Sequence, residues 1–497
     1  MTVVKKSISA CFCALLMANS PPSTAQADVT SNGRFMVDGS GRTLMIHGVN
    51  QVNKQPPFDH ISLGFDESHA AFLKDYGFNG IRLGILWAGV EPTRGQYDLE
   101  YLESIRQTVR MLDFHGFHVL LDLHQDAFST KNGGSGYPEW AALGGGNPSK
   151  LPFPLMYFDT EDNAVAQDFD AFWRNADGVQ DSYMDMLELV VATLGDEDGV
   201  LGIEFMNEPF PGTSWTDCGS FTSGQVPPWD FSEGCVEFDS TTLTDFYKRA
   251  AARVRAVNQD IMVAYDELGI GGIGAPGHIG DIEDDNKVFS WHNYNSYDYA
   301  SIFENAEDHQ KSSGAAMLMT EFGASTDTDS FAEVLTLADS HLMSWMFWTY
   351  SNNPPYPISG DGLLPPEGEL QGLVYDLSQP MNAQNLSKDR AVNLDLERVE
   401  FLSRPYPQLT AGIPQSLEYD DATGVLKYRW TIEGYTGDSP HTQIYLPEHR
   451  FPNGYEVEAR NSVVISGPPN ASLLVLKNEG ADGARSGEVV VTPIGEK

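Results

Sequence analysis

The sequence has few basic residues for its length. Only 30 lysines and arginines stand against 70 aspartates and glutamates, so the 497-residue chain carries a formal net charge of −40 at pH 7. Such a charge is repelled by nucleic-acid phosphates and by anionic lipid head groups. We therefore expect no nucleic acid among the partners and no electrostatic membrane anchor. The balance is compatible with a soluble exported protein, and it carries no information about the fold.

Long apolar runs are missing as well. No stretch reaches the roughly 18 uninterrupted apolar residues of a membrane-spanning helix. The N-terminus instead has the pattern of a secretory signal peptide, with Lys5 and Lys6 before a short apolar core at Ala10–Ala18. Ala25-Gln26-Ala27 then provides a small-residue cleavage site. We predict a signal peptide over residues 1–27, cleavage after Ala27 and secretion of the mature chain.

Cysteine is scarce, with four residues in the whole chain. Two of them, Cys11 and Cys13, lie in the predicted signal peptide, which leaves Cys218 and Cys235. Because an exported protein folds in an oxidising compartment, we predict a Cys218–Cys235 disulfide; the alternative is two unpaired buried thiols. No cluster of histidine, cysteine and aspartate has convincing metal-ligand spacing. We expect neither a metal nor another cofactor.

What the sequence does contain is a regular alternation of apolar segments and amphipathic helical patterns from residue 43 to about residue 405. Strands that are apolar on both faces and regularly followed by helices favour a parallel sheet. The eight candidate strands cover residues 43–50, 80–86, 118–126, 200–208, 261–267, 288–294, 316–323 and 344–350. Eight such units predict an α/β fold, a (β/α)8 TIM barrel; a doubly wound sheet is the alternative.

Three insertions and a change of pattern define the organisation of the chain. The insertions are rich in glycine, proline and aromatic residues and lie at βα junctions, which form the catalytic face of a barrel: residues 127–180, 210–240 and 351–393. Beyond Arg404-Pro405-Tyr406-Pro407 the helical patterns end, and short alternating strands predict a small all-β sandwich. We predict a catalytic barrel over residues 28–411 and a C-terminal β-sandwich domain over residues 412–497.

Two glutamates stand at the ends of candidate strands. Glu208 lies between Asn207 and Pro209 after the fourth strand, and Glu321 ends the seventh. Since these ends meet on one face of a barrel, both carboxylates can reach one glycosidic bond, and cleavage with retention needs such a pair about 5 Å apart. The acid needs a raised pKa, whereas the nucleophile must stay ionised, and Arg82 is a candidate for the cation that keeps it so. A single glutamate at a strand end is usually a solvated acid; the pair favours catalysis.

The tripeptides Asn207-Glu208-Pro209 and Glu321-Phe322-Gly323 together resemble glycoside hydrolase family 5, a family of retaining (β/α)8-barrel enzymes. Further stretches resemble the endoglycoceramidases of that family, and they extend over the barrel and the C-terminal domain: His47-Gly48-Val49-Asn50, Leu86-Trp87, Val90-Glu91-Pro92, Gly95-Gln96-Tyr97-Asp98, Leu121–Asp126, Phe169–Trp173 and Gln443–Glu448. The resemblance implies a retaining endo-β-glycosidase that cleaves the bond between oligosaccharide and ceramide in glycosphingolipids. Alternatives are a family 5 β-glucanase, a relative specific for steryl glucosides or galactosylceramides, and a non-catalytic carbohydrate-binding protein.

The resemblance also implies roles for individual residues. Glu208 corresponds to the acid/base, Glu321 to the nucleophile, and Asn207 to the residue that binds the sugar 2-hydroxyl. The other implied substrate contacts are Lys54, His124, Asp126, His292, Tyr294 and Trp348. Taken singly, most of these have a simpler structural explanation, such as a core histidine or tryptophan or an exposed lysine. His47 departs from the family pattern, since an arginine is common at this position. Tyr265-Asp266-Glu267 and Thr349-Tyr350-Ser351 have no assigned role.

The implied lipid substrate needs an apolar site. Ceramide has two long apolar chains, so an exposed apolar trough is expected beside the catalytic pair. Insertion 127–180 offers candidates for it: Tyr137, Trp140, Leu143, Leu151, Phe153, Leu155, Met156, Tyr157 and Phe158. The alternative is that these side chains only attach the loop to the barrel. An exposed strip would also permit transient contact with a membrane or micelle surface, and we expect the protein to be a monomer.

Overall fold

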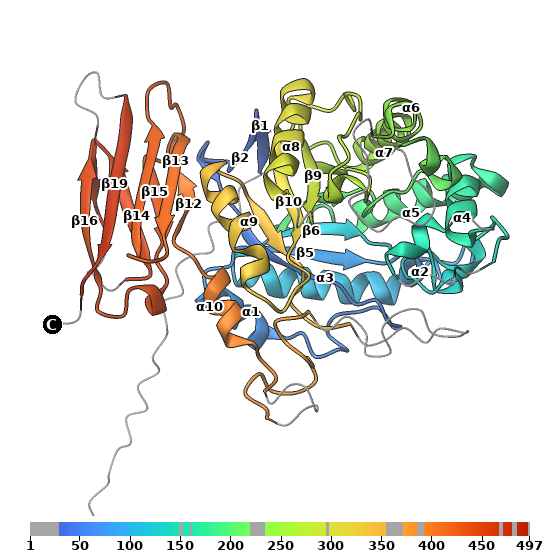
Figure 1. Cartoon of the computed structure of the whole chain (residues 1–497), viewed down its shortest axis with the longest axis horizontal. Helices are drawn as coiled ribbons and strands as arrows, with labels where there is room; N and C mark the ends of the chain where they lie inside the picture. The colour runs from blue at the N-terminus through green and yellow to red at the C-terminus, as the bar shows by residue number, and fades with distance from the viewer. Residues whose placement is uncertain are drawn as a thin grey trace, which may run out of the picture.

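The computed structural model shows a barrel and a β-sandwich packed side by side (Figure 1). It describes residues 29–147, 149, 153–159, 162–218, 234–294, 298–353, 371–384, 392–466, 471–479 and 485–495. The predicted signal peptide, residues 1–27, lies outside these ranges, as does most of the predicted insertion 351–393. None of the helices in the described part is long and apolar enough to cross a membrane.

Eight parallel strands close into a barrel within the described residues, which confirms the predicted fold and excludes the doubly wound sheet. In order around the barrel they are β4 (His47–Gln51), β5 (Gly80–Ile85), β6 (His118–Leu123), β7 (Val200–Glu204), β8 (Met262–Asp266), β9 (Lys287–Asn293), β10 (Ala316–Phe322) and β11 (Trp345–Phe347), which returns to β4. The first candidate strand, 43–50, is divided: β3 (Thr43–Leu44) pairs with strands of the sandwich, and only β4 enters the barrel.

Helices surround the barrel because their apolar residues recur at three- and four-residue spacing. In α3 (Leu99–Phe114) the side chains of Leu102, Ile105, Val109 and Leu112 form the buried stripe, and Asp98 caps the first turn by accepting the amide hydrogens of Glu100 and Tyr101. The other main helices are α1 (Glu67–Asp75), α5 (Val179–Leu194), α7 (Thr244–Val257), α8 (Tyr299–Ser313), α9 (Asp329–Ser340) and α10 (Leu396–Leu402). After β8 the chain forms only the short 3₁₀ helix η7 (Gly271–Ile273) before β9.

The βα connections carry further, mostly short helices. They are α2 (Trp87–Val90), η1 (Thr130–Asn132), η2 (Glu139–Ala141), η3 (Leu155–Phe158), α4 (Ala164–Trp173), η4 (Ala176–Gly178), η5 (Gly212–Asp217), α6 (Val236–Phe238) and the π-helix η6 (Asp239–Leu243). Cys218 and Cys235 form the predicted disulfide, with Cα atoms 4.2 Å apart. The bond joins the end of η5 to the start of α6 and so closes the insertion after β7.

The sandwich consists of two antiparallel sheets, which confirms the predicted all-β second unit. The seven-stranded sheet has the order β1 (Thr30–Asn32), β2 (Phe35–Val37), β3, β12 (Tyr406–Thr410), β15 (His441–Tyr445), β18 (Leu473–Asn478) and β17 (Ser462–Val464). The four-stranded sheet has the order β13 (Ile413–Asp420), β14 (Val425–Thr431), β19 (Ser486–Pro493) and β16 (Tyr455–Arg460). The short 3₁₀ helix η8 (Glu448–Arg450) follows β15.

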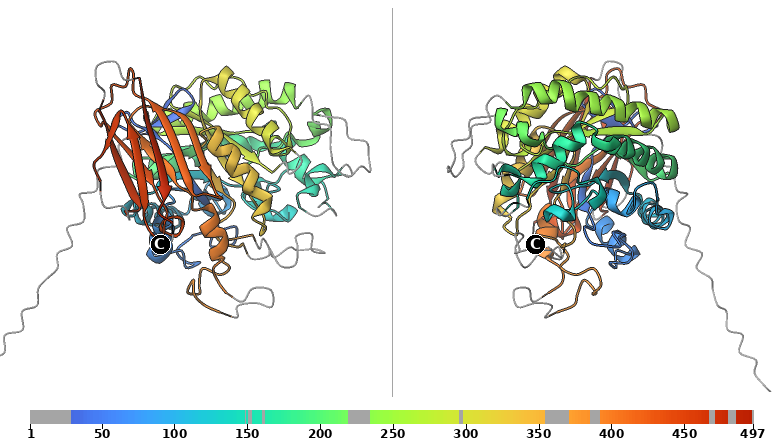
Figure 2. Two further views of the ribbon diagram at one scale, coloured as in Figure 1. Left: turned by 60° about the vertical axis from the view of Figure 1, so that its left-hand side comes forward. Right: turned by 90° about the vertical axis from the view of Figure 1, so that its right-hand side faces the viewer.

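The N-terminal strands belong to the sandwich rather than to the barrel. β1, β2 and β3 extend the seven-stranded sheet at the edge of β12, so the sandwich includes residues on both sides of the barrel in sequence. The predicted boundary at residues 411–412 falls between β12 and β13, where the chain passes from one sheet to the other. Turned views show the sandwich strands as a separate layered block beside the helices of the barrel (Figure 2).

His47 lies at the contact between the two units. Its ring stacks on Tyr406 of the sandwich at 3.6 Å and on Trp345 of the barrel at 4.3 Å. Burial, and secondarily the Arg404 guanidinium, lowers the pKa of His47 well below its usual value, so the ring is neutral. The residue that departs from the family pattern at this position therefore fills an aromatic interface.

Candidate active site

The two glutamates meet at one end of the barrel. Glu321 is the penultimate residue of β10, and Glu208 lies four residues beyond the end of β7. One carboxylate oxygen of each and a ring nitrogen of His292 lie within 4.8 Å of one another. This separation fits the roughly 5 Å of a retaining glycosidase and leaves no room for the water that an inverting enzyme places between its carboxylates.

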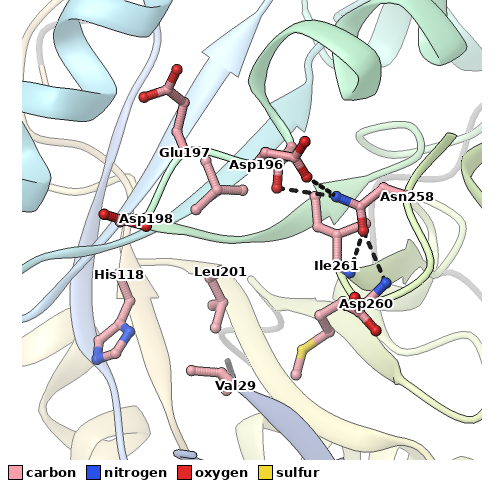
Figure 3. Close-up of a pocket in the computed structure, with 12 residues that line it drawn as sticks. Val29, His118, Asp196, Glu197, Asp198, Leu201, Asn258, Asp260 and Ile261 are labelled. Atoms are coloured by element: carbon pink, nitrogen blue, oxygen red, sulfur yellow. Dashed lines mark hydrogen bonds between the residues drawn. The ribbon is translucent and has the colours of Figure 1, made fainter. Parts of the chain in front are cut away.

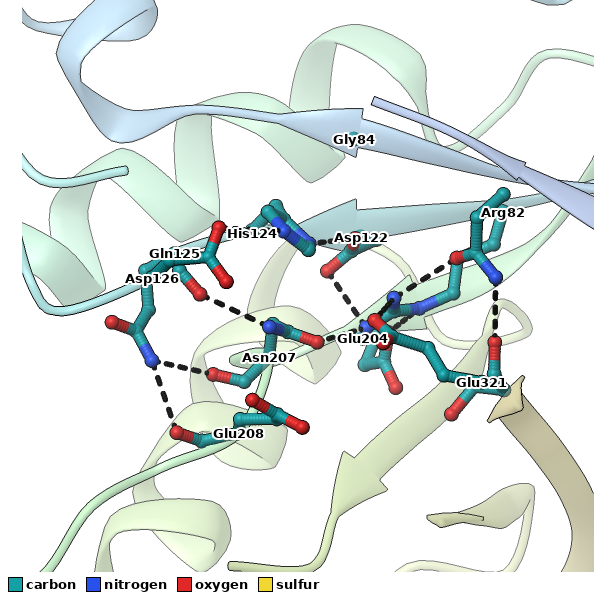
Figure 4. A network of polar contacts seen from close by, with 12 residues as sticks. Arg82, Gly84, Asp122, His124, Gln125, Asp126, Glu204, Asn207, Glu208 and Glu321 are labelled. Atoms are coloured by element: carbon teal, nitrogen blue, oxygen red, sulfur yellow. Dashed lines mark hydrogen bonds and ion pairs between the residues drawn. The ribbon is translucent and has the colours of Figure 1, made fainter. Parts of the chain in front are cut away.

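Arg82 binds the carboxylate of Glu321 inside the barrel (Figure 4). The guanidinium is fully buried on β5, and its Nη1 donates to Glu321 Oε1 at 2.6 Å. Tyr294 donates its hydroxyl to the other oxygen, Oε2, at 2.8 Å. Both oxygens of Glu321 thus accept a hydrogen bond, and one of them lies beside a cation, an arrangement that suits a nucleophilic carboxylate.

The same guanidinium orders the strands around it. Its Nε donates to Glu204 Oε2 at 2.6 Å, its Nη2 donates to Asn207 Oδ1 at 2.7 Å, and Nη2 lies 3.2 Å from Asp122 Oδ1. Asn207 in turn donates through Nδ2 to the Gln125 carbonyl at 3.0 Å. That amide nitrogen carries a second hydrogen, which is the one that a sugar hydroxyl would accept under the predicted role of Asn207.

His292 lies between the two glutamates. Its Nδ1 is 2.8 Å from Glu208 Oε1 and 3.7 Å from Glu321 Oε2. Burial alone would lower the pKa of His292, but the carboxylates of Asp266, Glu321 and Glu208 outweigh burial and raise that pKa well above its usual value. An imidazolium at this place limits the repulsion between two carboxylates that share one cavity.

The predicted sugar contacts form a second cluster. Lys54 Nζ lies 2.7 Å from Asp126 Oδ2 and 4.5 Å from the centre of the Trp348 ring. His124 stacks on the same ring at 5.3 Å and faces Asp122 at 2.8 Å and Asp126 at 3.3 Å. Burial opposes protonation, yet the two aspartates raise the pKa of His124 to about 9. The cluster therefore presents alternating charges, which suit the vicinal hydroxyls of a sugar.

All the predicted site residues of the barrel gather at this end, but they are not equally accessible. Lys54, Asp126, Tyr294 and Trp348 line the same cavity as the two glutamates. Arg82, His124, Asn207 and His292 are buried behind that surface. Prediction from sequence missed four buried carboxyl groups in or next to the site: Asp122, Glu204, Asp266 and Glu267. The signal was available, because each is an acid that lies near the end of an apolar strand or directly after it.

The cavity beside the glutamates has a volume of about 400 Å³ and a largely apolar wall. Of the nine apolar residues predicted for the trough, Phe153, Tyr157 and Phe158 line it. Tyr137 instead packs in the core against Trp87, so both proposed roles of this insertion occur. Leu151 lies outside the described residues. Prediction missed the part of the wall contributed by the loops after β7 and β8: Pro209, Phe210, Ile270 and Ile273.

A second cavity, of about 180 Å³, opens at the opposite end of the barrel (Figure 3). Its walls come from the first residues of β6, β7 and β8 and from an acidic loop, Asp196–Asp198. The Asn258 side chain ties this loop to the start of β8 by donating to Asp196 Oδ1 and accepting from Ile261 N. This second cavity shares no lining residue with the cavity that contains the glutamates.

Glu208, His292 and Glu321 also form a group with the ligand types of a metal site, which prediction from sequence did not anticipate. Their atoms already serve other partners, since His292 pairs with Glu208 and both Glu321 oxygens accept hydrogen bonds. The Arg82 guanidinium, 2.6 Å from Glu321, repels a further cation at this place. The arrangement suits a pair of reacting carboxylates better than a cation ligand set.

Comparison with known proteins defines the family. Residues 40–354 match the family described as cellulase (glycosyl hydrolase family 5), which is more than half of the chain. The chain belongs to glycoside hydrolase family 5. Residues 404–491 match the glycoside hydrolase family 5 C-terminal domain, which covers most of the sandwich.

The family 5 relatives include endoglycoceramidases. The chain is 28% identical to endoglycoceramidase I of Rhodococcus hoagii (strain 103S), over 95% of this chain and 89% of the relative. It is 26% identical to the endoglycoceramidase of Cyanea nozakii, over 92% of this chain and 91% of the relative. The solved structure of endo-glycoceramidase II from Rhodococcus sp. in complex with ganglioside GM3 shares the fold, with a TM-score of 0.70, 22% identity and coverage of 93% of this chain and 100% of that one.

We expect the protein to lose stability as pH rises from about 4 to 8. Burial raises the pKa of Glu267 to about 8 and that of Asp239 to about 7, from ordinary values of 4.5 and 3.8. Between the unfolded and the folded pKa values of these groups, the folded chain holds more protons than the unfolded chain. The stabilisation from the two groups is therefore complete below their unfolded pKa values and is lost as pH rises through their folded pKa values. Glu267→Gln and Asp239→Asn should each flatten the decline in unfolding temperature. If the unfolding temperature falls with pH as steeply in both variants as in the wild type, these two groups do not cause the decline.

Proposed function

We propose that the protein is a secreted retaining endo-β-glycosidase that releases oligosaccharide from the ceramide of glycosphingolipids. The observation that carries the proposal is the position of the two glutamates, one bound by Arg82 and the other in hydrogen-bond contact with His292, in the wall of a largely apolar cavity. Membership in family 5 and the similarity to endoglycoceramidases over the whole barrel and sandwich support the choice of substrate.

The reaction follows from the arrangement of the pair. Glu321 attacks the anomeric carbon as the bond to the ceramide oxygen breaks, and Glu208 gives its proton to that oxygen. Water then attacks the same carbon, Glu208 takes a proton from the water, and the ester bond to Glu321 breaks. The free oligosaccharide leaves with retained configuration, and both glutamates return to their initial states. Arg82 and Tyr294 stabilise the carboxylate of Glu321 whenever it is released.

The apolar wall supports a lipid aglycone over a polymeric sugar. A β-glucanase binds sugars on both sides of the cleaved bond. In this protein Phe153, Phe158 and Phe210 line the same cavity as the catalytic pair. Lys54, Asp126 and Trp348 supply the polar and aromatic contacts that a single sugar ring needs. Cleavage of steryl glucosides or galactosylceramides is the alternative that shares this apolar requirement.

Product analysis tests the proposal. The purified protein is incubated separately with a ganglioside in detergent micelles, with galactosylceramide, with a steryl glucoside and with a soluble β-glucan. Intact ceramide together with a free, complete oligosaccharide is the expected result. Cleavage of the glucan alone, or of the steryl glucoside alone, would overturn the proposed substrate while leaving the family assignment intact.

Ile273→Asp should weaken the use of lipid substrates selectively. Ile273 forms part of the apolar cavity wall, and loss of one apolar contact of about 1.5–3 kcal/mol corresponds to a rise in KM of roughly 10- to 100-fold. The kcat/KM for a short water-soluble aryl β-lactoside should change less than about threefold, because that substrate makes no use of the wall. Val257→Asp, an exposed apolar position at the end of α7 and outside the cavity, is the matched control and should affect neither substrate. Equal losses on both substrates would contradict a lipid role for this wall.

The proposal extends to where and how the protein meets its substrate. Several exposed apolar side chains lie in βα loops, the face that carries the glutamates: Ile61, Leu143, Leu155, Val236 and Val392. They support transient contact with a membrane or micelle surface. The Cys218–Cys235 disulfide supports export, and we propose a monomer cleaved after Ala27. N-terminal sequencing of protein from the culture medium checks the cleavage site.

A further inference from the structure

Asp266 ends β8 in Tyr265-Asp266-Glu267, a motif to which the family resemblance assigned no role. The residue is fully buried, so its carboxyl group must have partners inside the protein. Its Oδ2 accepts the backbone N–H of Glu208 at 2.8 Å and lies 3.5 Å from His292 Nε2. The neighbouring Tyr265 points elsewhere and pairs its hydroxyl with His309. Asp266 alone of this motif therefore contacts Glu208 by a hydrogen bond.

Glu208 needs such a partner because its backbone is strained. Its φ of 41° lies in the left-handed region, which is unfavourable for a non-glycine residue unless its surroundings hold it there. Two side chains do so: Asp266 holds the N–H, and Gln125 Nε2 donates to the Glu208 carbonyl at 3.0 Å. Relaxation of this turn to ordinary dihedrals would turn the Glu208 carboxyl group away from the bond that it protonates.

We propose that Asp266 is a positioning residue for the acid/base, which fixes the backbone of Glu208 and faces the far side of the histidine that pairs with it. The inference rests on the proposed role of Glu208. It accounts for the unassigned motif by connecting β8 to the reacting group through a backbone hydrogen bond and an ion-pair contact. Asp266 touches no substrate atom under this proposal and acts only through Glu208 and His292.

The charges around the contact are mutually compensating. His292 faces Glu208 and Glu321 on one side of its ring and Asp266 on the other. Behind Asp266 lie the charges of Glu204 and Arg82, which act on it with opposite sign. Glu267 accepts the backbone N–H of His292 at 3.2 Å and so anchors the backbone that carries the ring. His292 is thereby held in place from both β8 and its own strand, β9.

The test compares two substrates that differ only in their need for an acid. An alkyl β-lactoside releases a poor leaving group that must be protonated, whereas 2,4-dinitrophenyl β-lactoside releases a stable phenolate that needs no proton. We measure kcat/KM, which reports the first step, for the wild type, Glu208→Ala, Asp266→Ala and Asp266→Asn. Glu208→Ala should lose roughly 10²- to 10⁴-fold on the alkyl substrate and little on the aryl one.

Asp266→Ala should show the same dependence on leaving group, with a loss of roughly 10- to 100-fold on the alkyl substrate. Asp266→Asn should restore most of the activity, because its carbonyl oxygen can accept the Glu208 N–H. If the alanine variant does not fold, Asp266→Ser, whose hydroxyl is too short for this contact, replaces it. Asp239→Ala is the matched control: this buried carboxyl group accepts one backbone N–H, that of His278 at 2.9 Å, outside the site.

The outcomes separate the inference from the function on which it rests. Equal losses on both substrates in Asp266→Ala, as expected for Asp239→Ala, would mean that Asp266 only stabilises the fold and would overturn the inference. An Asp266→Asn variant as defective as Asp266→Ala would overturn it too, because the backbone contact would not be what matters. If Glu208→Ala itself shows no dependence on leaving group, the assignment of Glu208 as acid/base fails, whatever Asp266 does.

Discussion

Glu321→Ser is expected to reduce kcat on a glycosphingolipid by roughly 10⁴- to 10⁶-fold, the scale on which removal of a covalent nucleophile acts. The reason is geometric, since the serine hydroxyl is too short to reach the anomeric carbon from β10. Serine also leaves Arg82 and Tyr294 without a clash, because it brings no amide hydrogen toward the two donors that Glu321 now satisfies. Substrate affinity should therefore be retained.

Two measurements check this result and separate an enzyme from a carbohydrate-binding protein. A 2-fluoro sugar with a good leaving group should label the wild type at one position, seen as an added mass on the peptide that contains Glu321, and should not label the variant. Glu333→Ser, an exposed glutamate on α9 shortly after β10, is the control and should behave as wild type. Full binding without labelling or turnover in the wild type would indicate a binding protein.

The fold was accessible from the sequence because its signals are local and periodic. Most strands of the barrel are apolar runs, and the main helices have apolar residues at three- and four-residue spacing, so these elements could be predicted without knowledge of their neighbours. The division of 43–50 into β3 and β4 was not accessible. Thr43 and Leu44 are as apolar in context as the residues after them, and only their pairing with β2 and β12 removes them from the barrel.

The site was accessible to the extent that its residues stand in short motifs. Glu208 and Glu321 lie in tripeptides that identify the family, whereas Asp122 and Glu204 are single acids in apolar strands whose importance depends on Arg82 across the barrel. Prediction of the apolar cavity wall from sequence is limited in the same way. Phe158, which lines the cavity, and Tyr137, which packs in the core, belong to one insertion of uniform composition. Composition alone does not distinguish a binding wall from a core, because both bury apolar surface.

Arg82→Met is expected to lower the free energy of unfolding by about 3–5 kcal/mol, the usual cost of removing one partner from a buried ion pair. Arg82 is the cation that contacts three buried carboxylates: Asp122, Glu204 and Glu321. Burial alone would lower the pKa of Arg82, yet these carboxylates raise it well above its usual value, which shows how strongly they depend on its charge. Urea unfolding monitored by tryptophan fluorescence measures the loss. Arg94→Met, which breaks an exposed pair with Asp177, is the control and should cost no more than about 1 kcal/mol.

The double variant Arg82→Met/Glu204→Gln separates stability from catalysis. Removal of one of the carboxylates left without a cation should recover roughly 1–3 kcal/mol of the loss. Activity should stay at the level of Arg82→Met, because Glu321 still lacks the donor 2.6 Å from its Oε1. Recovery of both stability and activity would mean that Arg82 serves the fold alone. Recovery of stability without activity would instead assign two roles to one guanidinium: it pairs with the buried carboxylates of the barrel, and it supports the nucleophile Glu321 through a direct hydrogen bond.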